Sequence, residues 1–430
     1  MTFKSITKKE FETSLSSNFT FEDNPHIGLC ISGGPDSMAL LMLMRDWIKT
    51  INGKITALHF NHNLRPESKL EAKILKKQLN KLEVNCLKIE WKHEKINSRV
   101  MELAREARYE KIINLCKKLR IINLMTAHNF DDNLETYLMR KKRSKSSLGL
   151  SSIPKMKIVD NLRIIRPLLS YKKKRLEATC KKFKIQWIDD KSNFNDNFER
   201  IRIRNSLKLK NQKEIEKISA EFHKKKKDNL LVEKKISRFF CKELKFYNYG
   251  VFQIDKKKFK KNTNHLQIEI LKKLLTTAAG KIFSPKTKSV KIFLGLLKKN
   301  ESFNFTLHTC LIKVCVDHIK VYKEILAKHE IENFFLKKGS KLQWQNRFTI
   351  ETSKSDLKFC NISRANWPFL KKKLRFKNID LNFLTLQSLP VLKIKNVTLI
   401  PFLSDIKSFD KLGVKFYFNT VLPLYKKNFF

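Results

Sequence analysis

The first 205 residues alternate between short apolar runs and longer segments with helical spacing, and this alternation constrains the fold more than any other feature. Strands that alternate with helices of about 12–20 residues are typical of a parallel sheet covered by helices on both faces. The sequence therefore predicts an α/β fold with a doubly wound parallel sheet. Strands are expected at 26–31, 55–60, 84–89 and 121–127, and helices at 37–49, 67–82, 99–119 and 131–142.

After residue 205 the pattern changes. The next stretch is rich in lysine, with helical spacing at 211–235 and 266–279, and short alternating β-type runs dominate from 303 onward. We expect a catalytic domain at 1–210, a helical middle domain at 211–302 and a smaller β-containing C-terminal domain at 303–430. The β-type runs of the last domain lie at 304–307, 311–316, 348–350, 390–394 and 397–400.

The charge balance points to a polyanionic partner. Lys and Arg total 91 against 41 Asp and Glu, a formal net charge of +50, which draws a protein to nucleic acid or to anionic membranes. The chain is also rich in Lys, Asn, Ile and Phe, as AT-rich coding tends to produce, so compositional drift is the alternative source of this charge. The longest apolar run, 38–44, is far shorter than the roughly 20 residues of a spanning helix.

The cysteines and the N-terminus indicate a reduced, cytoplasmic protein. The eight cysteines are scattered without a C-x-x-C pair, which argues against a zinc ribbon, an iron–sulfur site or a disulfide framework. Residues 1–17 lack the apolar core of a secretory signal.

Glycine marks the first candidate site. The chain has 10 glycines where about 30 are expected, and two are adjacent in S-G-G-P-D-S, Ser32–Ser37, between a predicted strand and a predicted helix. Backbone N–H groups in this context can form an anion nest for phosphates, whereas an ordinary turn is the alternative. The P-loop lysine is missing, which argues against a Walker-type kinase or GTPase. Asp36 would repel a phosphate unless a divalent cation lies between them, so it implies Mg²⁺.

These residues carry a resemblance. Ser-Gly-Gly-x-Asp-Ser is similar to the PP-loop of the ATP pyrophosphatase superfamily, which cleaves ATP to AMP and pyrophosphate. Further segments, in chain order, resemble the tRNA(Ile)-lysidine synthase family most closely over 27–205, and loosely through 344–348 and the closing β region. These segments are 58–68, 104–109, 127–136, 166–169, 190–193 and 200–204.

The resemblance implies an ATP-dependent ligase that acts on the isoleucine tRNA with the CAU anticodon. In this family the ε-amine of free L-lysine is joined to C2 of the wobble cytidine through an adenylated cytidine, with release of AMP and pyrophosphate. The product changes codon and amino-acid identity. ATP and Mg²⁺ are the implied cofactors, and L-lysine is the co-substrate.

The same resemblance nominates residues for the chemistry. Free lysine is about 1 part in 2,500 neutral at pH 7, so the amine needs a nearby base or a site that lowers its pKa. Asp131, Asp132 and Glu135 are candidates to hold Mg²⁺, bind the ammonium or act as base, and helical spacing puts Glu135 on the face of both aspartates. An acidic first turn that only complements the helix dipole is the alternative. The implied catalytic residues are Asp36, His128, Asp131, Asp132 and Glu135; those that bind ATP are Ser32, Gly33, Gly34, Pro35, Asp36 and Ser37; those that bind metal are Asp36 and Asp132.

His128 and five arginines complete the predicted site. His128 can contact phosphate, shuttle a proton or be an ordinary core histidine. The arginines, Arg105, Arg108, Arg143, Arg200 and Arg204, are expected to bind tRNA or phosphate through their paired N–H donors. Salt bridges to Glu102 or Glu106 are the alternative for the first two.

Two departures and three rival functions remain. Asn129 stands where many members have a second histidine, and 143–150 replaces a loop that is normally Gly-rich. The rivals are a PP-loop tRNA thiolase, an amidotransferase-type ligase, and a tRNA-binding protein with a decayed site. The lack of C-x-x-C argues against the first, the lack of a glutaminase region against the second, and the intact Ser32–Ser37 loop against the third.

Overall fold

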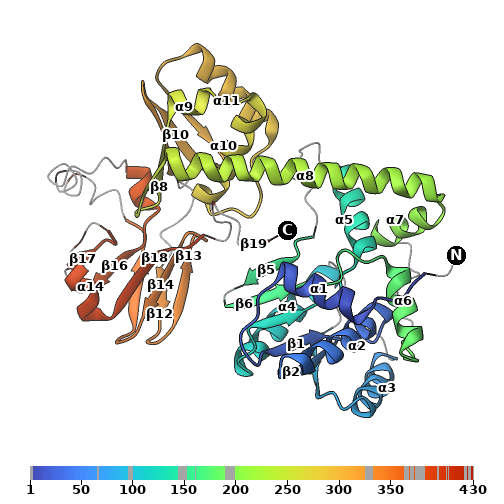
Figure 1. Ribbon diagram of the computed structural model, residues 1–430. Coiled ribbons are helices and arrows are strands. Elements are labelled where there is room, and N and C mark those ends of the chain that lie inside the picture. The colour runs from blue at the N-terminus through green and yellow to red at the C-terminus, as the bar shows by residue number, and fades with distance from the viewer. Residues whose placement is uncertain are drawn as a thin grey trace. The chain divides into compact units, whose positions relative to one another are not determined.

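The computed structural model divides the chain into two compact units (Figure 1). One unit is Met1–Lys227 with Lys427–Phe430, and the other is Asp228–Lys426, so the boundary falls within helix α8 (Gln212–Glu243). The predicted division into three domains stays a prediction. The structure describes residues 3–64, 67–94, 100–143, 153–159, 161–188, 199–324, 333–362, 383–394, 397–402, 406–420 and 428–429, together with 368, 372, 404 and 424.

The first unit is built on a seven-stranded sheet in the order β19-β5-β6-β4-β1-β2-β3. Neighbours from β6 to β3 pair in parallel, and β5 and β19 add an antiparallel edge. The predicted doubly wound parallel sheet is therefore confirmed. The strands are β1 (His26–Cys30), β2 (Lys54–Asn61), β3 (Cys86–Glu90), β4 (Asn123–Met125), β5 (Met156–Val159), β6 (Leu162–Ile165) and β19 (Asn428–Phe429).

Alternation along the strands sends apolar side chains to two separate cores. In β2, Ala57 belongs to one core, whereas Leu58 and Phe60 belong to the other. Helices α1, α2, α3 and α6 contribute to the first core and α4 to the second, and α2 is buried on all sides over 37–44. The helices are α1 (Lys8–Asn18), α2 (Pro35–Thr50), α3 (Ser68–Lys81), α4 (Val100–Lys118), α5 (Phe130–Arg143), α6 (Lys173–Lys182) and α7 (Glu199–Lys208).

The strand order places the site. The chain proceeds from β1 to β2 and β3 in one direction, and β4 and β6 lie on the other side of β1. The order therefore reverses between β1 and β4, and sheets of this kind bind ligands beyond the carboxyl ends of the strands at such a point. Helix α2 follows β1 and α5 follows β4, so both helices begin at this edge.

The described residues of the second unit form three antiparallel sheets. The helical segments predicted at 211–235 and 266–279 correspond to α8 and α10, but β7 and β8 also lie within the predicted helical region. Among the described helices, none is both long and apolar enough to cross a lipid bilayer. The sheets, each with its strands in order, are β7-β8-β11-β10-β9 (Leu244–Tyr247, Val251–Asp255, His318–Lys323, Cys310–Val314, Phe303–Leu307), β12-β15-β16-β17 (Asn333–Leu336, Leu357–Cys360, Val391–Ile394, Val397–Leu399) and β13-β14-β18 (Lys341–Trp344, Phe348–Thr352, Val414–Phe418). The described helices that follow α8 are α9 (Lys256–Lys260), α10 (Asn264–Ala279), α11 (Thr287–Lys299), α13 (Phe383–Gln387) and α14 (Ile406–Leu412).

Arg347 lies fully buried in the core of the second unit. Its Nη1 donates to Ser388 Oγ at 3.0 Å and its Nη2 to the Gly250 carbonyl at 2.9 Å. Gly250 has φ +81°, and a Cβ there would collide with the guanidinium, so glycine is required. Burial lowers the pKa of Arg347 to about 10. The segment 344–348, which resembles the synthase family loosely, thus has a structural role in this chain.

We expect Arg347→Met to lower the free energy of unfolding by about 3 kcal/mol, because it removes two buried hydrogen bonds, to Ser388 Oγ and to the Gly250 carbonyl. Urea unfolding of the full chain measures this loss. Arg238→Met, at an exposed position on α8, is the control and should change the midpoint little. Equal midpoints for the two variants would contradict the role of Arg347.

Candidate active site

The loop Ser32–Gly34 joins β1 to α2 in the predicted strand–loop–helix arrangement. Gly33 has φ +91°, and a Cβ there would lie 3.2 Å from Ile188 Cδ1, so both backbone conformation and space favour glycine. Gly34 caps the helix and Pro35 occupies its first turn, where the missing N–H of proline costs nothing. The loop therefore presents the N-terminus of α2 at the edge of the sheet.

The buried hydroxyl of Ser37 holds this loop in shape. Its Oγ accepts from the backbone N–H of Ser32 at 3.3 Å and of Gly33 at 3.1 Å, and it donates to the Gly34 carbonyl at 2.9 Å. These two loop N–H groups therefore point inward to Ser37. The N–H groups of the first turn of α2, which a helix leaves without an intrahelical partner, remain to bind an anion.

Asp36 carries an unsatisfied oxygen. Its Oδ1 is buried and has no hydrogen-bond partner among the described residues. Burial raises the pKa of Asp36 to about 7, Lys173 opposes this rise and the charge of Asp132 adds to it. A buried carboxylate oxygen without a donor suits a hard cation such as Mg²⁺. The described residues contain no group of three His, Cys, Asp or Glu side chains suited to a metal.

His128 follows β4 at the same edge. Its Nδ1 lies 2.9 Å from Thr126 Oγ1. Burial lowers the pKa of His128 to about 3, and the charges of Arg166, Arg200, Arg105 and Arg108 lower it further. The imidazole is therefore neutral at physiological pH.

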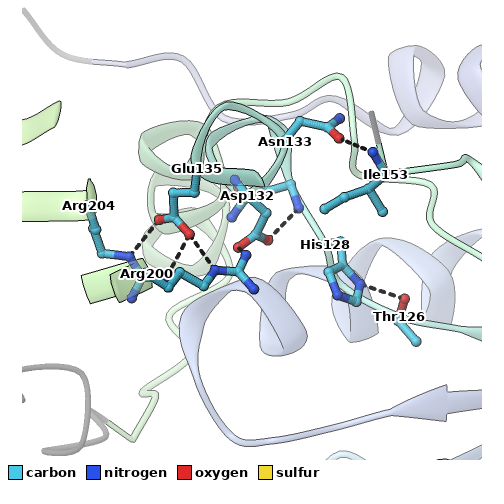
Figure 2. A network of polar contacts seen from close by, with 9 residues as sticks. Thr126, His128, Asp132, Asn133, Glu135, Ile153, Arg200 and Arg204 are labelled. Carbon is cyan, nitrogen blue, oxygen red and sulfur yellow. Dashed lines mark hydrogen bonds and ion pairs between the residues drawn. The ribbon is translucent and has the colours of Figure 1, made fainter. Parts of the chain in front are cut away.

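Two predicted catalytic carboxylates and two predicted phosphate-binding arginines form one network (Figure 2). Glu135 is 3% exposed; its Oε2 accepts from Arg200 Nε at 2.6 Å and its Oε1 from Arg204 Nε at 2.7 Å. Arg200 Nη2 also donates to Asp132 Oδ1 at 2.6 Å. Helical spacing puts Arg200 and Arg204 on one face of α7 and Asp132 and Glu135 on one face of α5.

Asp131 lies outside this network. Its Oδ2 accepts from the backbone N–H of Lys173 at 2.7 Å, where α6 begins, and burial raises its pKa. The carboxylates of the α5 motif therefore have two sets of partners, and Asp132 and Glu135 share Arg200. Asp131 links α5 to α6, whereas Asp132 and Glu135 link α5 to α7.

The structure describes the side chains of some of the remaining predicted residues and not of others. Arg105 and Arg108 on α4 both lie over the ring of Tyr109, at 5.3 and 5.6 Å, and both charges reach His128. Arg143 ends α5, but its side chain lies outside the described residues, as do the rest of the unusual loop and the 190–193 segment.

Arg166 is a residue that sequence reasoning quoted without assigning it a role. It follows β6, is 5% exposed, and donates through Nη1 to the Pro154 carbonyl at 2.9 Å. Its Nε is buried without a partner among the described residues, and its charge acts on His128. Its position directly after the apolar run 162–165, which was not predicted as a strand, is the signal that could have identified it.

Comparisons with known proteins agree with this geometry. The profile of the PP-loop domain matches residues 5–211. The tRNA(Ile)-lysidine synthase of Rickettsia prowazekii (strain Madrid E) is 31% identical over 391 residues, 88% of this chain and 89% of the relative. The synthase of Rickettsia bellii (strain OSU 85-389) is 32% identical over 402 residues, which are 89% of this chain and 92% of the relative. The synthase of Orientia tsutsugamushi (strain Boryong) is 30% identical over 315 residues, which are 71% of this chain and 71% of the relative. The solved U34-tRNA thiolase NcsA from Methanococcus maripaludis, with its [4Fe-4S] cluster, aligns with a TM-score of 0.42 at 14% identity, covering 50% of this chain and 77% of that one.

The raised pKa of Asp36 has a consequence for stability. A carboxyl whose pKa is about 7 in the folded state and 3.8 ordinarily binds more protons when folded, so its contribution to stability falls as pH rises from 4 to 7. Asp36→Asn removes this ionisation. We expect the variant to melt several degrees above the parent at pH 8 and close to it at pH 4, with the difference measured by thermal denaturation across that range.

Asp23→Asn, at an exposed position, is the control and should show no such pH-dependent difference. A difference in melting temperature between Asp36→Asn and the parent that is the same at pH 4 and pH 8 would contradict the raised pKa of the buried Asp36 carboxyl.

Proposed function

The chain belongs to the tRNA(Ile)-lysidine synthase family, and we propose that it joins free L-lysine to C2 of the wobble cytidine in the isoleucine tRNA with the CAU anticodon. The observation that carries this proposal is the placement of Asp36 and Asp132 at the adjacent carboxyl ends of β1 and β4, beside a PP-loop and a cluster of arginines. We place the reaction in the cytoplasm.

The first step uses ATP to activate a poor electrophile. The C2 oxygen of cytidine attacks the α-phosphorus, the bond to the β-phosphate oxygen breaks, and pyrophosphate leaves. We propose that the first-turn N–H groups of α2 bind the phosphates, with the loop held rigid by Ser37. Preorganised donors cost no rearrangement when charge develops on the leaving group.

Mg²⁺ fits the buried Oδ1 of Asp36, which has no donor among the described residues. When bound, a divalent cation would neutralise charge on the pyrophosphate. That Asp132 is a second ligand of the cation remains a prediction. Its Oδ2 already accepts from the Asn129 N–H at 2.9 Å, and its Oδ1 accepts from Arg200. Carboxylate oxygens have two lone pairs each, so these bonds leave room for another partner.

In the second step the ε-amine of lysine attacks C2. The C2–O bond breaks, AMP leaves with that oxygen, and the amine proton passes to a base. We propose that Asp132 and Glu135 receive the lysine ammonium and its proton. Arg200 donates to both carboxylates and Arg204 to Glu135, so the two acidic side chains are held side by side.

The neutral His128 and its arginines favour a phosphoryl group at the same edge. Four guanidinium groups whose charges reach one neutral imidazole make a site that attracts anions, and arginine binds phosphate oxygens through paired N–H donors. We propose that Arg105, Arg108, Arg166 and Arg200 bind phosphate of the nucleotide or of the tRNA there.

The thiols near the loop argue against sulfur transfer by this chain's own cysteines. Cys30 ends β1, and burial raises its pKa to about 11. Cys180 donates to the Pro35 carbonyl at 3.2 Å, and burial raises its pKa to about 12. Neither supplies a thiolate at neutral pH, which is the nucleophilic form.

Mass spectrometry of the product tests the proposal. Isoleucine tRNA incubated with the protein, ATP, Mg²⁺ and labelled lysine should gain the mass of one lysine minus one water, only when ATP is present. Asp132→Asn and Glu135→Gln should each lower this incorporation by about 100-fold or more, the range for loss of a general base. Accumulation of adenylated tRNA would assign the altered residue to the second step.

Glu221→Gln is the matched control, since Glu221 pairs with Lys141 at 2.7 Å on an exposed part of the first unit. It should leave lysine incorporation unchanged. Full activity of both Asp132→Asn and Glu135→Gln would remove these carboxylates from the mechanism.

We further propose that the second unit binds the body of the tRNA. Lys257, Lys258 and Lys260 are exposed on α9, and each phosphate neutralised by such a residue steepens the salt dependence of binding by about 0.7–0.9 in the log–log slope. The triple change of these lysines to glutamine should therefore weaken tRNA binding and flatten the slope. Binding titrations at several salt concentrations measure both.

The same triple change at Lys73, Lys76 and Lys77, exposed on α3 of the first unit, is the matched control. Equal slopes for both triple variants would mean that the α9 lysines are solvated surface residues that do not contact tRNA phosphates. Full-length variants are needed, because β19 near the C-terminus pairs with β5 and belongs to the first unit.

A further inference from the structure

Thr126 and His128 form a hydrogen-bonded pair where β4 ends. Thr126 directly follows β4 and is 7% exposed, and its backbone N–H donates to the Ile165 carbonyl at 2.9 Å. Figure 2 shows its hydroxyl oxygen facing the ring of His128, with Oγ1 2.9 Å from Nδ1. Either atom can be the donor in this hydrogen bond, and the position of the imidazole proton decides which of them is.

The hydroxyl of Thr126 identifies the donor. A buried hydroxyl needs an acceptor for its proton, and His128 Nδ1 is the only hydrogen-bond partner of Thr126 Oγ1 among the described residues. If Nδ1 carried the imidazole proton, Thr126 would accept, and its own proton would be left without an acceptor at a cost in free energy. Thr126 therefore donates to Nδ1, and the proton of the neutral imidazole is on Nε2.

The arginines around His128 leave this second nitrogen free. A guanidinium only donates, so an arginine bonded to the ring would need a nitrogen without a proton. The charges of Arg105, Arg108, Arg166 and Arg200 act on His128, yet none of them donates to the ring in the part of the chain that the structure describes. The Nε–H of Arg166, which follows the neighbouring strand β6, is itself buried there without an acceptor. Two N–H groups after adjacent strands thus lack an acceptor, and a phosphoryl oxygen can only accept.

A proton on Nε2 decides between the roles open to an imidazole. A general base takes up a proton at its unprotonated nitrogen, and in His128 that nitrogen is Nδ1, which Thr126 already occupies. Burial and the four arginine charges lower the pKa of His128 to about 3, so the ring does not gain a second proton between about pH 5 and 8. Its Nε2–H is consequently a neutral donor over this whole range.

We propose that Thr126 is a positioning residue that keeps the proton of His128 on Nε2, and that His128 donates this hydrogen bond to a phosphoryl oxygen of the bound nucleotide and accepts no proton in the reaction. This inference rests on the proposed use of ATP. It assigns proton transfer to the carboxylates alone and gives His128 a share in binding the charge that develops on the phosphates.

The position of the proton can be measured directly. In the full chain with ¹⁵N-labelled histidine, long-range ¹H–¹⁵N spectra distinguish the two neutral tautomers, and the spectrum of His128→Gln identifies the signals of His128. We expect the Nε2–H form in the parent and in Thr126→Ser, which keeps the hydroxyl, and a mixture of both forms in Thr126→Val. The Nδ1–H form in the parent would overturn the proposal.

His59 is the internal reference for this spectrum. Its Nδ1 lies 2.9 Å from the Ile31 carbonyl, which only accepts, and burial lowers the pKa of His59. His59 should therefore show the Nδ1–H form, opposite to His128, in every variant.

Two substitutions of His128 separate a donor from a base. Glutamine places an amide N–H about where Nε2–H lies but cannot act as a base, whereas leucine supplies neither. We expect pyrophosphate release in the presence of tRNA to fall by less than about 10-fold in His128→Gln and by about 100-fold or more in His128→Leu, the range for loss of one preorganised donor. Equal losses in the two variants would overturn the donor role.

Thr126 has a matched control in the same unit. Thr56 Oγ1 lies 2.8 Å from His26 Nε2, and His26 begins β1, whereas the Ser32–Gly34 loop follows the end of that strand. We expect Thr126→Val to slow pyrophosphate release by about 2-fold or more, in proportion to the fraction of His128 that leaves the Nε2–H form, and Thr126→Ser and Thr56→Val to match the parent.

Unchanged release in Thr126→Val, beside a mixed tautomer, would show that the position of the proton has no bearing on the reaction and would overturn the proposal. A parent that releases no pyrophosphate contradicts the proposed function instead. The tautomer of His128 is measured without turnover, so the two failures are distinguishable.

Discussion

The burial of Glu135 is the constraint on which the rest of the site depends. A carboxylate that is 3% exposed needs compensating donors, and Arg200 and Arg204 provide them at 2.6 and 2.7 Å. Both arginines come from α7, so the electrostatic requirement of one residue on α5 determines where α7 packs. The same pairing orients Asp132 through Arg200. Removing both arginines would leave the buried Glu135 carboxylate without these donors, and catalytic and structural roles therefore reside in the same side chains.

Asp36 presents the opposite situation at the neighbouring strand end. It is also buried, yet one of its oxygens has no donor among the described residues and its pKa is raised to about 7 by that burial. Glu135 is stabilised by its surroundings, whereas Asp36 is destabilised by them and would gain most from a cation. The carboxylate of Glu135 already has its donors, so the binding of a cation would lower the free energy of Asp36 rather than of Glu135.

Local patterns in the sequence predicted local structure well. Alternating apolar runs placed β1, β2, β3 and β4 and the helices between them, because burial on both faces of a sheet leaves that period in the sequence. Helical spacing also anticipated that Asp132 and Glu135 share a face of α5. The arginines that pair with these carboxylates are 65 to 69 positions away in α7, and the link from Asp131 to Lys173 spans 42 positions, so no local pattern encodes them. Strands β7 and β8 were missed because their lysine-rich surroundings indicated helix, and β19 pairs with a strand about 270 residues earlier.

The charges around the strand ends explain why the site suits a polyanion that arrives with a cation. Helices α2 and α5 both begin at this edge, and helix N-termini favour negative charge. Three carboxylates, Asp36, Asp131 and Asp132, already occupy the first turns of these helices, and Glu135 follows one turn later in α5. Arg200 and Arg204 pair with Asp132 and Glu135, and the charges of Arg105, Arg108, Arg166 and Arg200 act on His128. The arginine charges that act on His128 attract a phosphoryl group, whereas an ionised Asp36 opposes it, because Asp36 lies in the first turn of α2, where we propose that the phosphates bind. A divalent cation at Asp36 would change that balance, and so would release of an arginine from its carboxylate when the lysine ammonium takes its place.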